Sequence, residues 1–288
     1  MALLVSIVLP ARNAEATLRD ALISIQRQTF EDFEVIIMDD GSTDRTAEIA
    51  RSFADRRIRV LSDGKALGLA RRLNQCIKLA KGRFIARMDA DDVMHPDRLT
   101  RQVAEMMADP LIDVIGTDAW AIDANARILW FHPGHEPSSD PWTVAQRGMF
   151  IHPTVLGRTE WFRSNPYSDA YPRAEDHELW TRTCAHSRFA VIHEPLLYYR
   201  VRNPWRVAAE LASDRTGDRL IIEYGARAGR RREAYLCVLG HRWHRLVLTF
   251  GAASGLRWLK WRLRSTTSQD SSLQKAQREL ALTILFNG

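Results

Sequence analysis

The chain contains 288 residues, of which 45% are hydrophobic and 26% are charged, as in ordinary globular proteins. Its three cysteines are widely spaced, which argues against a disulfide framework or a zinc site and favours a reduced, cytoplasmic setting. No uncharged apolar run approaches the roughly 18 residues of a transmembrane helix, and the N-terminus lacks the pattern of a signal peptide.

The net charge of +6 is unevenly distributed along the chain. Residues 201–288 contain 16 Lys and Arg against 7 Asp and Glu, whereas residues 1–200 contain 25 against 28. A basic segment of this kind is expected to contact an anionic partner, either lipid headgroups or nucleic acid. We therefore predict a globular domain at residues 1–205 and a basic, Trp- and Arg-rich helical tail at residues 206–288.

Strand and helix patterns alternate in the first ninety residues. Short apolar runs predict four strands, at residues 3–9, 33–38, 58–61 and 84–88. Apolar residues at helical spacing and an Asp44 cap predict the helices between them, at residues 15–28, 44–53 and 69–80. This alternation is typical of a parallel sheet with helices on both faces, in which ligands bind beyond the carboxyl ends of the strands.

Polar loops follow three of these strands, and the loop after residue 88 is the most acidic. It contains Asp89, Asp91 and Asp92, and strand alternation would direct Asp89 and Asp91 to the same side. Three neighbouring carboxylates repel one another unless a cation lies between them, and the pattern suits a hard divalent metal with its phosphates. The alternative is an acidic turn that caps the helix beginning near Pro96.

The pattern changes after Pro110. We predict a hairpin, a proline-rich loop, a strand, a helix and a last apolar segment, at residues 114–131, 133–141, 150–156, 175–184 and 189–201. In the tail, residues 255–264 combine Leu, Trp and basic side chains, as interfacial helices do. That segment would otherwise pack on the globular domain with a solvated basic rim.

The order of these motifs resembles the inverting glycosyltransferases of family 2, which have the GT-A fold. The matching segments are residues 8–13, 37–44, 88–92, 96–99, 150–154, 174–180 and 196–200. The resemblance implies a mixed, mostly parallel sheet flanked by helices, with the tail as a C-terminal helical extension outside the match. It also implies transfer of a sugar, with inversion, from a UDP-sugar to a hydroxyl of a glycan or glycolipid acceptor, as in cell-surface polysaccharide synthesis.

The resemblance also implies nucleotide contacts. Pro10 and Asn13 would line the nucleotide end of the crevice. Asp40, next to Asp39, would accept a hydrogen bond from the imide N–H of uracil, a donor that cytosine lacks. The alternative for the two aspartates is a helix-capping turn. Candidates for phosphate or sugar contacts are Arg71, Arg72 and Lys65, although a solvated helix face is the stronger interpretation of these three.

By the same resemblance, Asp91 would bind Mn²⁺ or Mg²⁺ directly, and Asp89 would face the ribose or a metal-bound water. The donor diphosphate and water would complete the ligand set, and the cation would neutralise the leaving group. Asp92 is expected to turn away toward the following helix.

Inversion also requires a base for the acceptor hydroxyl. The resemblance assigns this role to Asp176, which a helix N-terminus would keep ionised, with Glu175 as the second candidate. Both carboxylates could instead serve only to begin that helix. His152 is a candidate contact for the acceptor or the diphosphate, unless it is structural.

Two other classes of protein compete with this interpretation. Nucleotidyltransferases use a similar sheet but need a Gly-rich phosphate loop, and the first strand here is followed by Pro10 to Glu15 with no glycine. A non-enzymatic, basic-tailed binding module is the other class, but the chain has no zinc spacing and its tail Trp residues lie among leucines. We therefore expect no nucleic acid, and place the protein in the cytoplasm, peripheral on the inner face of the membrane.

Overall fold

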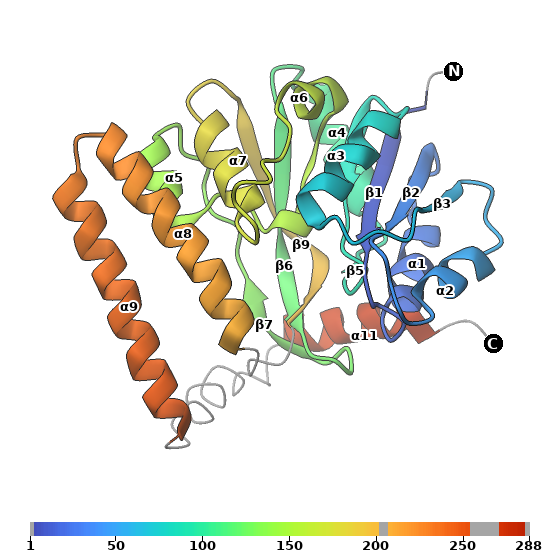
Figure 1. Ribbon diagram of the computed structural model, residues 1–288. Helices are drawn as coiled ribbons and strands as arrows, with labels where there is room; N and C mark the ends of the chain where they lie inside the picture. The colour runs from blue at the N-terminus through green and yellow to red at the C-terminus, as the bar shows by residue number, and fades with distance from the viewer. Residues whose placement is uncertain (1–2, 202–206, 254–270, 286–288) are drawn as a thin grey trace.

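The computed structural model describes residues 3–201, 207–253 and 271–285, and within these ranges a nine-stranded sheet is flanked by helices (Figure 1). The sheet order is β3-β2-β1-β4-β8-β6-β9-β5, and β7 pairs with β6. The predicted α/β architecture, with helices at the C-terminal end, is confirmed.

The N-terminal half of the sheet is parallel. Its strands are β1 (Val5–Ala11), β2 (Phe33–Asp39), β3 (Ile58–Ser62) and β4 (Phe84–Arg87). The helices between them are α1 (Leu18–Gln26), α2 (Thr46–Ser52) and α3 (Leu69–Leu79). Alternate residues of β1 pack toward α1 and toward α3, because both faces of the strand are covered. This double burial explains why the strand is an unbroken apolar run.

The second half of the sheet is mixed. Its strands are β5 (Val93–Met94), β6 (Val114–Ile122), β7 (Ile128–His132), β8 (Leu156–Arg158) and β9 (Phe189–Arg200). β8 is antiparallel to both β4 and β6, and β9 runs parallel to β6. The strands β1, β2, β4, β6 and β9 therefore end at the same edge of the sheet. The predicted hairpin of β6 and β7 is confirmed.

Short helices connect and cover this half. They are α4 (Arg98–Ala108), α5 (Pro141–Arg147), α6 (Thr159–Ser164) and α7 (Glu175–Thr183). The predicted strand at residues 150–156 is wrong, because His152–Thr154 forms a 3-10 turn, η1, and β8 begins only at Leu156. Pro153 cannot donate to a ladder, and the carbonyl of Thr154 accepts a hydrogen bond from Gln102 instead of from a strand.

The tail is helical where it is described, and it packs on the rest of the protein. α8 (Val207–Arg227) and α9 (Arg231–Ala253) form a hairpin beside α5 and α7, whereas α11 (Ser271–Leu285) lies against α1 (Figure 1). Leu280 of α11 is fully buried in a cluster with Tyr198 of β9. The predicted interfacial segment at residues 255–264 lies outside the described residues.

Candidate active site

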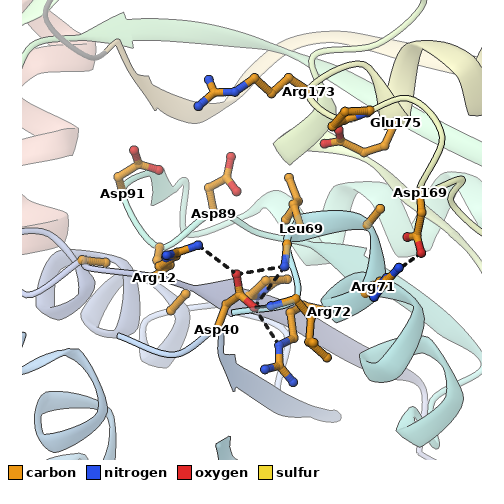
Figure 2. Close-up of a pocket in the computed structure, with 18 residues that line it drawn as sticks. Arg12, Asp40, Leu69, Arg71, Arg72, Asp89, Asp91, Asp169, Arg173 and Glu175 are labelled. Atoms are coloured by element: carbon orange, nitrogen blue, oxygen red, sulfur yellow. Dashed lines mark hydrogen bonds and ion pairs between the residues drawn. The ribbon is translucent and has the colours of Figure 1, made fainter. Parts of the chain in front are cut away.

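A cavity of about 680 Å³ lies beyond the carboxyl ends of β1, β2 and β4 (Figure 2). We call it the first cavity. Its charged lining residues are Arg12, Asp40, Arg71, Arg72, Asp89, Asp91, Asp169, Arg173 and Glu175. Parallel strands direct their C-terminal loops to a common edge, so residues far apart in the sequence meet there. The residues predicted from the sequence that line this cavity are Pro10, Asp40, Arg71, Arg72, Asp89, Asp91 and Glu175.

Asp40 lies on the wall formed by β2, is 5% exposed, and is surrounded by donors. Its carboxylate accepts hydrogen bonds from the backbone N–H groups of Leu67 at 2.6 Å and Gly68 at 3.1 Å, and from Nε of Arg72 at 2.9 Å. A guanidinium nitrogen of Arg12 lies 3.8 Å away. Arg72 is therefore buried in an ion pair, not on the solvated helix face that its sequence pattern favours.

Asp39 and Asn13 shape the neighbouring loops and do not line the first cavity. The Asp39 carboxylate accepts hydrogen bonds from the N–H of Ser42 at 3.2 Å and the hydroxyl of Ser62 at 2.8 Å. The side chain of Asn13 accepts from the N–H of Thr43 at 2.9 Å, and its backbone has a φ of 48°, a conformation that asparagine tolerates. Asn13 thus holds the loop that follows β2 against the loop that follows β1, whereas Asp39 ties the loop that follows β2 to the end of β3.

The acidic loop after β4 is held from two sides by arginines. The guanidinium of Arg87, which is 3% exposed, contacts the carboxylate of Asp89 at 2.7 Å. Arg200 of β9 donates from its backbone N–H to Asp92 at 2.7 Å and from Nε to the carbonyl of Asp91 at 2.7 Å. Asp92 therefore turns away from the cavity, as predicted, but toward β9 and not toward the following helix. Burial is the main cause that raises the pKa of Asp92.

The carboxylates of Asp89 and Asp91 remain on the cavity side of this loop (Figure 2). Two oxygen-donor side chains at the mouth of a cavity suit a hard divalent cation, which takes its other ligands from phosphates and water. The main chain around Asp91 is fixed by Arg200, so this carboxylate projects from a supported loop.

Glu175 and Asp176 begin α7 and face different spaces. Glu175 lines the first cavity, whereas Asp176 lies 3.8 Å from Nδ1 of His152, measured from Oδ2. Burial and the neighbouring Asp176 raise the pKa of Glu175 to about 7. Burial also lowers the pKa of His152, whose Nε2 is 2.9 Å from the hydroxyl of Tyr167. His152 is thus neutral at physiological pH. It lies close to both carboxylates, since one ligand atom of each of the three residues lies within 4.8 Å of the others.

A second cavity of about 420 Å³ lies on the other side of residues 173–176. Asp176, His177 and Trp180 of α7 form one part of its wall, and Asp218 of α8 and His241 of α9 form another. Arg173, with a φ of 66°, lines both cavities. The sequence interpretation missed Arg12, Arg173, Asp218 and His241. Arg12 and Arg173 lie in or beside recognisable motifs, but nothing in the tail sequence indicated the other two.

The sheet, the cavity at its carboxyl edge and the acidic loop define a GT-A-type glycosyltransferase fold, and solved structures of that class are similar. The TarS protein of S. aureus in complex with UDP matches 77% of this chain and 70% of its own length, with a TM-score of 0.56 and 20% identity. The mannosyltransferase PcManGT of Pyrobaculum calidifontis, in complex with GDP-Man and Mn²⁺, matches 98% of this chain and 87% of its own length. Its TM-score is 0.59 and its sequence identity is 17%.

The sequence comparisons identify the family. Residues 6–165 match the model of glycosyl transferase family 2, and the chain belongs to that family. An uncharacterized glycosyltransferase of Methanocaldococcus jannaschii is 29% identical over 69% of this chain and 71% of its own. The Escherichia coli protein WfgD is 32% identical over 62% of this chain and 68% of its own length. It is named as a UDP-Glc:alpha-D-GlcNAc-diphosphoundecaprenol beta-1,3-glucosyltransferase. The predicted enzyme class is confirmed, and the nucleotidyltransferase and binding-module alternatives fall away.

Proposed function

We propose that this glycosyltransferase is metal-dependent and inverting, and that it moves a sugar from a UDP-sugar to a hydroxyl of a lipid-linked glycan in cell-surface polysaccharide synthesis. The observation that carries the proposal is the first cavity, which gathers Asp40, Asp91 and Glu175 from three separate elements. Its volume is in the range of sites for nucleotide-sized ligands. The names of TarS, crystallised with UDP and with UDP-GlcNAc, and of WfgD support the choice of donor and acceptor.

In this proposal the nucleotide lies at the end of the cavity near Pro10 and Asp40. The carboxylate of Asp40, oriented by Arg72 and Gly68, accepts the imide N–H of uracil. Asn13 and Asp39 act indirectly, since they fix the loops that carry these contacts. Arg71 lines the same cavity and pairs with Asp169 at 2.6 Å, so it is a contact for the donor sugar or diphosphate only if that pair opens.

We assign the divalent cation, Mn²⁺ or Mg²⁺, to Asp91, and place Asp89 toward the ribose or a metal-bound water. The ion pair with Arg87 already occupies the carboxylate of Asp89, which supports the indirect role given to that residue. The bound cation supplies charge neutralisation for the diphosphate as it leaves. TarS and PcManGT share only the fold with this chain, so the metal itself follows from the carboxylate donors and not from those structures.

We assign the base to Asp176. An acceptor hydroxyl attacks the anomeric carbon from the side opposite the diphosphate, and Asp176 accepts its proton. Glu175, with its raised pKa, is protonated below neutral pH and then places no second negative charge beside Asp176. His152, which is neutral and 9% exposed, orients Asp176 and does not itself transfer a proton in this scheme.

We also propose that the tail contacts an anionic membrane surface and holds the protein at the inner face of the membrane. α9 supports this, because Tyr235, Leu236, Leu239 and Trp243 are each more than half exposed. The described helices include none that is both long and apolar enough to cross a bilayer. Contact would therefore be through a helix lying in the interface.

The proposed chemistry can be tested by measuring UDP release with Mn²⁺ and a panel of UDP-sugars. We expect Asp91→Ala and Asp176→Asn each to lower turnover by roughly 10²- to 10⁴-fold, because one removes a metal ligand and the other a general base. Glu160→Gln is the control, since this carboxylate is 81% exposed and, among the described residues, pairs with Arg163 on the surface. Full turnover in either active-site variant would refute the role assigned to the replaced residue. If the wild type turned over none of the UDP-sugars in the panel, the proposal of a UDP-sugar donor would be refuted.

A further inference from the structure

The two cavities meet at the start of α7. Glu175 faces the first cavity, Asp176 faces the second, and Arg173 lines both. A general base must lie within hydrogen-bond reach of the acceptor hydroxyl, which itself attacks the reacting carbon of the donor. If the first cavity holds the donor, the space beyond Asp176 is where the acceptor hydroxyl must come from.

We propose that the second cavity binds the terminal sugar of the acceptor, and that Asp218 of α8 hydrogen-bonds its hydroxyl groups and selects among acceptors. The inference rests on the proposed function and extends it. It makes the helices of the tail part of the active site, since α8 contributes Gly217, Asp218 and Ile221 to the cavity wall and α9 contributes His241.

The chemistry of the wall suits a saccharide. Asp218 is 6% exposed and lies 3.5 Å from Nδ1 of His241, so a carboxylate acceptor of hydrogen bonds is held at the edge of the cavity. The indole of Trp180 is 1% exposed, and none of the described residues accepts a hydrogen bond from its N–H. Its ring packs edge-to-face against the ring of Phe150, with 5.0 Å between the two ring centroids, and both residues line the cavity. The cavity therefore has an aromatic side. Aromatic surface with a few fixed polar groups is the usual make-up of a small-ligand site.

The wall is also firmly attached to the catalytic part of the protein. Ile221 of α8 and Val238 of α9 are buried in a cluster with Trp142 of α5. A Cβ atom added to Gly225 would lie 2.4 Å from the Cβ of Ala234, so only glycine lets α8 and α9 approach this closely. The hydroxyl of Tyr171 donates to Glu223 of α8. Asp218 is therefore positioned by packing, as a residue that sets specificity must be.

Two glycines provide a matched steric test. An added Cβ meets nothing within 4 Å at Gly217, which lines the second cavity, or at Gly240, which does not. Both lie inside helices, so a leucine at either position improves helix propensity and should not prevent folding. We expect Gly217→Leu to raise the acceptor KM at least ten-fold without changing the dissociation constant of UDP with Mn²⁺, whereas Gly240→Leu changes neither.

The polar test is Asp218→Asn, with Glu233→Gln on the exposed side of α9 as its control. The probes are GlcNAc, GalNAc, Glc and Gal, each joined through a diphosphate to a short polyprenyl chain, and both transfer and binding are measured. We expect Asp218→Asn to reduce kcat/KM for the best acceptor by roughly 10- to 100-fold, because a charged hydrogen bond is lost. The kcat/KM values of the four acceptor probes should also become more alike.

The outcomes separate this inference from the proposed function. Unchanged acceptor KM and selectivity in both Gly217→Leu and Asp218→Asn would overturn the inference. So would a wild-type protein that hydrolyses UDP-sugars but neither binds nor glycosylates any of the four probes. Failure to hydrolyse or bind any UDP-sugar would instead count against the proposed donor chemistry, whatever the two variants do.

Discussion

Arg87 occupies the last position of β4, with its guanidinium buried beside Asp89, and Arg200 contacts the same loop from β9. These two cations offset the repulsion among Asp89, Asp91 and Asp92 before any metal is bound. The sequence suggested that the three carboxylates need a cation between them. The structure supplies cations from residues 87 and 200, so the loop can fold without a metal.

This arrangement predicts a specific rescue. Replacing Arg87 with Met removes a buried cation from the partly buried carboxylate of Asp89, which should lower the free energy of unfolding by roughly 3–5 kcal/mol. Added Mn²⁺ should then raise the Tm of Arg87→Met by more than that of the wild type, because it replaces the missing positive charge. Thermal denaturation with and without Mn²⁺ measures both effects. Arg45→Met, at an exposed pair with Glu48, is the control, and equal Mn²⁺ shifts in all three proteins would contradict the prediction.

Glu175 carries a second residue-scale prediction, which concerns pH. Its pKa is about 7 in the folded protein against an ordinary 4.5, so the folded state holds a proton that the unfolded state releases. The resulting stabilisation is complete below about pH 4.5 and is lost as the pH rises through 7. It amounts to roughly 3 kcal/mol.

Glu175→Gln keeps a neutral side chain at every pH. We expect it to match the wild type near pH 4 and to exceed its free energy of unfolding by up to roughly 3 kcal/mol at pH 8, as measured by urea denaturation. Glu160→Gln, at an exposed position, should show no such trend. A difference between Glu175→Gln and wild type that is the same at both pH values would show that Glu175 has no raised pKa.

At the scale of elements, α9 presents two faces. Ala234 and Val238 are buried against α8 and α5, whereas Tyr235, Leu236, Leu239 and Trp243 project from an opposite arc of about 100° at 3.6 residues per turn. Exposed basic residues lie on and beside that arc, at Arg231, Arg232 and Arg242. Apolar side chains with arginines around them match the requirements of an anionic bilayer surface.

We therefore predict that vesicles containing phosphatidylglycerol bind the wild type and release the triple variant Leu236→Ser, Leu239→Ser, Trp243→Ser. Met107→Ser with Leu111→Ser is the control, because those two side chains are equally exposed but lie on and just after α4. Sedimentation with vesicles gives the bound fraction, which should fall about ten-fold in the triple variant only and should also fall with salt. Equal binding of all three proteins would exclude α9 as the docking face.

The elements differ in how well the sequence predicts them. β1 and β2 are covered on both faces, so their apolar runs are unbroken and their strands could be placed within a residue or two. Residues 150–156 have a similar apolar run, but two features give them a 3-10 turn instead of a strand. Pro153 is visible in the sequence, whereas the hydrogen bond from the side chain of Gln102 to Thr154 is a tertiary contact that the sequence does not show. The motifs indicated the residues around the first cavity. The wall formed by α8 could not be predicted, since Asp218 belongs to no pattern.

For the whole molecule, the predicted boundary at residue 205 has a testable consequence. Removing the tail would uncover Trp142 and Tyr171, which pack against α8 and α9, and Tyr198, which packs against Leu280 of α11. We expect residues 1–205 to melt about 10 °C or more below the full chain, because several fully buried side chains lose their neighbours. Differential scanning calorimetry of the two proteins measures this. A Tm within 2 °C, about the effect of 1 kcal/mol, would establish residues 1–205 as an independent domain.

The position of α11 bears on how the protein is made. Of the described elements it is the last to be synthesised, yet it packs against α1, which is among the first, and Gln277 bonds to the backbone of residues 126 and 128. Until residues 271–285 have left the ribosome, Val93, Ile122 and Tyr198 lack a cover on that side. The nascent chain therefore carries an apolar patch from the completion of β9 until α11 has been made, a surface on which a chaperone can bind before α11 closes over it.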